Sequence, residues 1–101
     1  MSAPQWKNIY ELSEDQFQRL EQAEEKMESM EINTAESILK SLLDEDENCI
    51  PVLNIYGHMY GRYLSDFESA IVYYDRVLQL EPDNTWARDE RRRYRRYVSY
   101  D

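Results

Sequence analysis

The chain has 101 residues, 42% hydrophobic and 33% charged, with a formal net charge of −9, which suits one small domain. Its short apolar runs exclude a membrane-spanning helix, and its start lacks the apolar stretch of a secretory signal. With Cys49 as the only cysteine no internal disulfide can form, so we expect a cytoplasmic protein.

Few glycines, prolines and β-branched residues favour an all-α protein. Capping signals and helical periods predict helices over 14–29, 34–44, 51–63, 66–80 and 84–98. Three pairs have the spacing of a capping box: Ser13 with Gln16, Asn33 with Glu36, and Ser65 with Glu68. Pro51 suits the first turn of the third helix, and Asp83 or Asn84 can cap the fifth.

Residues 53–82 carry a pattern of large and small residues that ends in a proline. Its members are Leu53, Tyr56, Gly57, Tyr60, Ala70, Tyr74 and Pro82. Gly57 costs its helix about 1 kcal/mol relative to alanine, which favours close packing of another helix at that point. The pattern resembles the tetratricopeptide repeat, written W-x2-L-G-x2-Y, A-x3-F, P.

A weaker copy of the pattern lies upstream. Ala35 and Leu39 stand 35 residues before Ala70 and Tyr74, against about 34 in the family. Two family positions are not kept in this copy, because Glu24 replaces the glycine and Glu47 replaces the proline. The gap from Gly57 to Ala70 is one residue longer than in the family, and the gap from Glu24 to Ala35 is one residue shorter. These departures leave the shape of the turns between helices open and keep the helix pairs.

The resemblance implies a right-handed α-α superhelix of two helix hairpins with a C-terminal solvating helix. We expect a leader over 1–12 and a single domain over 13–98. The domain would comprise repeat one at 13–47, repeat two at 48–82 and a capping helix at 84–98. The leader, with Trp6, Ile9 and Tyr10, either packs over the first hairpin, lies in the groove as a self-ligand, or is a flexible tail.

The family implies a noncatalytic function, in which an adaptor or chaperone-like scaffold holds a segment of a partner protein in its concave groove. The residues implied for that groove are Asn54, His58, Arg62, Glu21, Glu25 and Glu28. The glutamates favour a neutral or basic segment. The family's clamp for a C-terminal carboxylate is not expected, since only Asn54 matches it. The alternative is an ordinary polar helix face.

The last helix is rich in arginine, and tyrosines are interleaved. Its candidate surface comprises Arg92, Arg93, Arg95 and Arg96. Residues 1–48 hold thirteen acids and four bases, net −9, whereas residues 88–96 carry +4. Three interpretations remain open: a solvating helix, a nucleic-acid surface that the acidic chain disfavours, or a surface that docks on an acidic repeat and gives weak homo-oligomers.

Residues that carry catalysis are scarce in this sequence. His58 is the only histidine, and the two glycines form no phosphate-binding loop. The acidic run 44–47 lacks the spacing of a calcium loop and is expected to be a solvated connection. We therefore expect no enzyme activity, no cofactor, no metal and no membrane partner.

Overall fold

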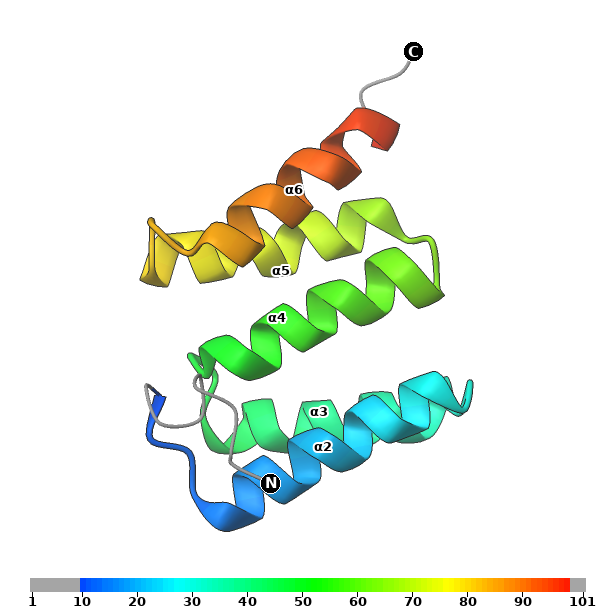
Figure 1. Cartoon of the computed structure of the whole chain (residues 1–101), viewed down its shortest axis with the longest axis vertical. Coiled ribbons are helices and arrows are strands. Elements are labelled where there is room, and N and C mark those ends of the chain that lie inside the picture. The colour runs from blue at the N-terminus through cyan, green and yellow to red at the C-terminus, as the bar shows by residue number, and fades with distance from the viewer. Residues whose placement is uncertain (1–9, 99–101) are drawn as a thin grey trace. The chain divides into compact units, whose positions relative to one another are not determined.

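The computed structural model describes residues 10–98, and this part of the chain contains helices and no strand. The helices are α2 (Glu14–Glu28), α3 (Ile32–Glu45), α4 (Ile50–His58), the π-helical segment η1 (Met59–Tyr63), α5 (Phe67–Leu80) and α6 (Thr85–Val98) (Figure 1). The predicted all-α class is confirmed. Trp6 and Ile9 lie outside the described residues, so the role of the leader stays a prediction. None of the described helices is both long and apolar enough to cross a bilayer.

The chain divides into two compact units, Met1–Val52 and Leu53–Asp101, with the boundary inside α4. The single domain predicted over 13–98 stays a prediction, and each unit is described by itself below.

In the first unit, α2 and α3 pack side by side (Figure 1). The residues that face inward recur at helical spacing: Phe17, Leu20, Ala23 and Met27 from α2, and Ala35, Leu39 and Leu42 from α3. Arg19 joins the two helices, because its guanidinium donates to Asp15 at 3.1 Å and to Glu45 at 2.6 Å. Such partly exposed ion pairs contribute at most about 1 kcal/mol each.

The helix starts correct two of the predicted caps. Ser13 and Gln16 form the predicted capping box before α2. However, α3 begins at Ile32 without a side-chain cap, so Asn33 lies inside the helix. Before α5 the cap is Asp66, whose carboxylate accepts from the Ser69 backbone N–H.

Ser65, the cap predicted there, cannot cap because its φ of 52° places it in the left-handed turn. Before α6, Asn84 is the cap, and its side-chain oxygen accepts from the Ala87 backbone N–H at 2.9 Å.

In the second unit, α5 packs against both η1 and α6 (Figure 1). The buried residues of α5 and α6 are Ala70, Tyr74, Val77, Ala87, Glu90 and Tyr94. Arg91 donates to Asp75 at 2.9 Å and ties α6 to α5. The last helix, α6, was predicted to cover the second hairpin. Its final turn does so only in part, because Tyr97 is 57% exposed and Val98 is 37% exposed.

The second helices of the two hairpins share their layout. The helices α3 and α5 begin 35 residues apart, at 32 and 67, and end 35 residues apart, at 45 and 80. The buried residues of the two helices pair at the same offset: Ala35 with Ala70, Leu39 with Tyr74, and Leu42 with Val77. Met30 and Ser65, also 35 apart, both adopt positive φ where their hairpins turn.

The first helix of the second hairpin differs from α2 by a π-helical turn. In η1 the Leu64 N–H donates to the Met59 carbonyl, five residues back. A π turn holds one residue more than an α turn and often marks a functional site. It lies inside the gap from Gly57 to Ala70, the gap that is one residue longer than in the repeat family. The extra residue therefore widens one helical turn.

The turn after η1 is also one residue longer than the turn after α2. At the first turn, the Glu31 N–H donates to the Lys26 carbonyl, five residues back. At the second, the Asp66 N–H donates to the Tyr60 carbonyl, six residues back. Both turns reverse the chain, and the second does so around one more residue.

Candidate functional site

An open groove of about 590 Å³ lies in the second unit, between the end of η1, the start of α5 and the C-terminal half of α6. We call it the arginine–aromatic groove. It is lined by Gly61, Arg62, Ser65, Phe67, Arg93, Tyr94, Arg96 and Tyr97. Residues from three segments that are far apart in the sequence therefore meet at one surface.

Local backbone geometry shapes the floor of this groove. Gly61 lies within the π turn, and a Cβ atom at this position would lie 2.4 Å from the ring end of Tyr94. Only glycine leaves room for that ring. Ser65, in the left-handed turn, and Asp66, the cap of α5, then reverse the chain so that Phe67 faces α6.

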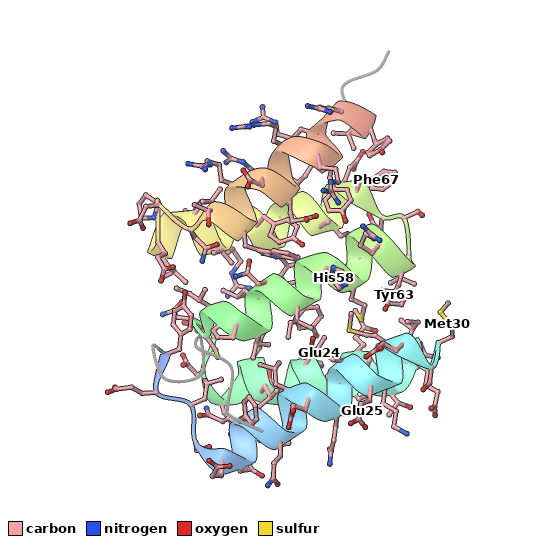
Figure 2. All side chains as sticks on the ribbon, in the orientation of Figure 1. Glu24, Glu25, Met30, His58, Tyr63 and Phe67 are labelled. Carbon is pink, nitrogen blue, oxygen red and sulfur yellow. The ribbon has the colours of Figure 1, made fainter. Side chains whose placement is uncertain are left out.

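Stacked rings form the apolar wall of the groove. Phe67 stacks on Tyr94, with ring centroids 5.5 Å apart, and on Tyr97, with centroids 4.7 Å apart. Figure 2 shows Phe67 at the start of α5, beside the C-terminal half of α6. Since Tyr94 is buried and Tyr97 is largely exposed, the wall offers ring surface to a ligand at its outer end.

Three arginines supply the charge of the groove. Within residues 10–98, Arg62 and Arg96 form no ion pair, and both are exposed. Arg93 has a long contact of 3.7 Å to Glu90. The guanidiniums of Arg62 and Arg96 are thus available to an anionic ligand, and a guanidinium can hold a carboxylate with two parallel hydrogen bonds.

A buried polar cluster lies deeper in the same unit. Within residues 10–98, His58 Nδ1 is enclosed without a hydrogen-bond partner, whereas the Tyr94 hydroxyl interacts with Glu90 and the Tyr74 hydroxyl with Trp86. Glu90 is only 7% exposed and is the buried charged residue of this unit's described core.

Burial favours the neutral form of the two tyrosines and of His58. It raises the pKa of Tyr94 to about 12, with the Glu90 carboxylate as the second cause. Burial also raises the pKa of Tyr74 above its ordinary value. Both hydroxyls therefore remain protonated at neutral pH. Burial lowers the pKa of His58, and the nearby Arg62 charge lowers it further.

The structure corrects the predicted exposure of two residues that were expected to line the concave surface. Asn54 and His58 were expected in solvent, but both are half-buried, and Asn54 Oδ1 and His58 Nδ1 are enclosed. The ring of His58 lies edge-on to Tyr63 and also near Trp86. For His58 the physical reason is that Tyr63 of η1 and Trp86 of α6 lie against its ring. Arg62 is exposed as predicted.

The predicted glutamates lie on α2 in the first unit. Glu21, Glu25 and Glu28 are all exposed, and Figure 2 shows Glu25 on this helix. The concave surface that they were expected to share with Asn54, His58 and Arg62 would join the two units, so it stays a prediction.

The structure divides the predicted arginine surface. Arg93 and Arg96 line the arginine–aromatic groove, together with Arg62 from the other predicted set, whereas Arg92 and Arg95 are exposed outside it. Sequence reasoning missed Gly61, Ser65 and Phe67. The longer gap between Gly57 and Ala70 was the available signal, because an inserted residue in a helix often marks a functional site.

Comparison with protein-family models, with curated proteins and with solved structures found no match to this chain.

Proposed function

We propose that this protein is a noncatalytic binding module, an adaptor or chaperone-like scaffold of the tetratricopeptide-repeat type, that holds a segment of a partner protein. The 35-residue offset between α3 and α5 supports the repeat, since the bounds of these two helices, their buried residues and the turns before them recur at that offset. In this proposal the hairpins belong to a right-handed superhelix and α6 is its solvating helix.

The arginine–aromatic groove is the observation that carries the proposal. Arg62 and Arg96 are cations without an ion pair in the described chain, and they flank stacked rings that end in the exposed Tyr97. This combination suits a short acidic segment that also carries an aromatic side chain.

The arginine–aromatic groove and the concave surface predicted from the sequence favour ligands of different charge. That surface, with Glu21, Glu25 and Glu28, would favour a neutral or basic segment. The groove favours an acidic one, so peptides of opposite charge distinguish the two surfaces.

The test uses fluorescent probe peptides and the full chain. One probe carries glutamates on both sides of a tyrosine, a second replaces the glutamates by glutamines, and a third replaces them by lysines. We expect the acidic probe to bind best. Arg62→Glu/Arg96→Glu should weaken its binding at least about tenfold, equivalent to about 1.4 kcal/mol.

The matched control is Arg88→Glu/Arg92→Glu, which makes the same charge change at exposed arginines outside the groove. If both double variants lose the acidic probe equally, net charge and not the groove governs binding. Preference for the basic probe would instead favour the concave surface.

Nucleic-acid binding is the second candidate function, and the interleaved arginines and rings of the groove favour it. The net charge of −9 opposes it, because the field of the protein repels a polyanion. A fluorescent single-stranded RNA in the same assay tests this candidate. RNA binding that is stronger than binding of the acidic peptide, and is lost in Arg62→Glu/Arg96→Glu, would make it the preferred function.

A further inference from the structure

We infer that the arginine–aromatic groove of one molecule takes the acidic face of α2 from a second copy of this chain, so that free protein associates head to tail. The inference rests on the proposed binding of acidic segments by this groove, and it names one such segment.

The acidic face of α2 is a continuous stripe. Glu21, Glu25 and Glu28 follow the spacing i, i+4, i+7, which places them on one side of the helix over about 10 Å. All three are exposed, and none forms an ion pair within residues 10–98. We call these three residues the glutamate stripe.

The cations of α2 do not neutralise this stripe. Arg19 is held by Asp15 and Glu45, and Lys26 lies 3.5 Å from Glu31. Neither cation is paired with a residue of the stripe, so the charge of the stripe is available to a cation of another molecule.

Glu24 lies on the same helix, next to two residues of the stripe (Figure 2). Burial is the largest cause of its raised pKa, and the carboxylates of Glu28 and Glu21 raise it further. A cationic partner would relieve this repulsion between like charges, which is a physical reason for the stripe to bind one.

The groove offers a complementary arrangement of positive charge. Arg93 and Arg96 lie one turn apart on α6, and Arg62 adds a third cation from η1. The stripe and the groove are different surfaces of the chain, so the contact is heterologous. Repetition of a heterologous contact builds chains or rings and not a closed two-fold dimer. Exposed ion pairs are weak, so the association should be weak and should fade as salt rises past roughly 0.15 M.

Charge reversal on each side provides the experiment. The groove variant is Arg62→Glu/Arg96→Glu, and the stripe variant is Glu21→Lys/Glu25→Lys. In sedimentation at low salt, we expect the wild type to show a mass that grows with concentration, and each variant alone to remain monomeric.

Mixing the two variants is the decisive step. The stripe variant keeps its groove and the groove variant keeps its stripe, so an equal mixture can form one intact contact. We expect a pair that grows no further, because each partner has lost its other surface. The pair would also prove that both variants fold. The control Asp44→Lys/Glu47→Lys makes the same charge change elsewhere in the first unit and should associate like the wild type.

Three outcomes would overturn the inference. A wild type that stays monomeric at low salt, while the acidic probe still binds the groove, removes self-association and leaves the proposed function standing. A wild type that associates, with variants that do not pair on mixing, means that other surfaces make the contact. A monomeric wild type that also ignores the acidic probe removes both proposals together.

Discussion

Gly57 and Gly61 each face the ring end of a buried tyrosine. A Cβ atom at Gly57 would lie 2.6 Å from Tyr74, and one at Gly61 would lie 2.4 Å from Tyr94. Gly57 was expected to meet the backbone of another helix, but the group against it is a side chain. Both glycines are therefore required by large neighbours and not by backbone conformation, since neither has a positive φ.

Substitution at Gly57 is the first prediction. Gly57→Leu should lower the free energy of unfolding by about 1–3 kcal/mol or more, because its side chain would occupy the space of the Tyr74 ring. Urea denaturation measures the change. A shorter side chain opposite should relieve the clash, so Gly57→Ala should cost less in a Tyr74→Leu background than in the wild type. Equal costs in the two backgrounds would show that the ring does not constrain this position.

Protonation of His58 is the second prediction. In the folded protein its pKa lies below the ordinary value of 6.5, mainly through burial and then through Arg62, while Glu90 opposes the shift. Below pH 6.5 the unfolded chain therefore binds a proton that the folded chain resists. Stability should fall as the pH falls from 7.5 to 5.5, by at most about 1.4 kcal/mol per pH unit.

The comparison for His58 is a variant that cannot titrate. His58→Gln should lose less stability over the same pH range in urea denaturation, since the carboxylates titrate alike in both proteins. If stability depended on pH in the same way in the two proteins, His58 would have the same pKa in the folded and the unfolded chain.

At the scale of elements, the π turn η1 distinguishes the two hairpins. The 35-residue offset holds for α3 and α5, for their buried residues and for the turns before them. The offset is interrupted in the first helices, where Glu24 and Gly57 are 33 residues apart, and η1 with its wider turn lies in that stretch. The groove lies at that interruption, because Gly61 and Arg62 come from η1 and Ser65 from the turn that follows it.

Substitution at Gly61 is the prediction at this scale. Replacing a helical glycine by alanine ordinarily stabilises a helix by about 1 kcal/mol. Gly61→Ala should instead destabilise the protein, because the methyl group meets the Tyr94 ring. Displacement of that ring should also weaken the acidic probe. Urea denaturation and probe anisotropy measure the two effects, and a stabilised variant with unchanged probe binding would contradict the proposed seating of Tyr94.

Across the whole molecule, charge is the property most unevenly distributed. Residues 1–48 carry −9, and the second half of the chain is neutral with its arginines concentrated in α6. The structure adds that most arginines of α6 are engaged or lie outside the groove, as the Arg91–Asp75 and Arg88–Asp89 pairs show. Binding is therefore expected to depend on a few particular cations and not on the total charge.

Two residues from the predicted partner-binding set test this point. Arg62→Ala should weaken the acidic probe, because Arg62 is an exposed cation of the groove. Asn54→Ala should leave the probe unaffected, since Asn54 is half-buried and does not line the groove. Circular dichroism should show unchanged helicity in the Arg62→Ala protein. Loss of the probe in Asn54→Ala alone would return the binding site to the predicted concave surface.

Helices and their inward faces could be predicted from the sequence, because each depends on residues within about four positions of one another. The capping box at Ser13 and the buried set of α2 are examples. The predicted helix caps were wrong at two helix starts that directly follow a reversal of the chain. Asn33 and Ser65 have suitable side chains, but the left-handed residues Met30 and Ser65 set where α3 and α5 begin.

The sequence by itself determined the all-α class, the five helical segments, the internal 35-residue echo and the separation of charge, since these are properties of composition and local spacing. Only the tertiary structure decided that Arg62 joins Arg93 and Arg96 beside Phe67, and that Asn54 and His58 withdraw from solvent. Those outcomes depend on which side chains of η1, α5 and α6 occupy the same space. Local spacing carries no information about contacts between segments thirty residues apart.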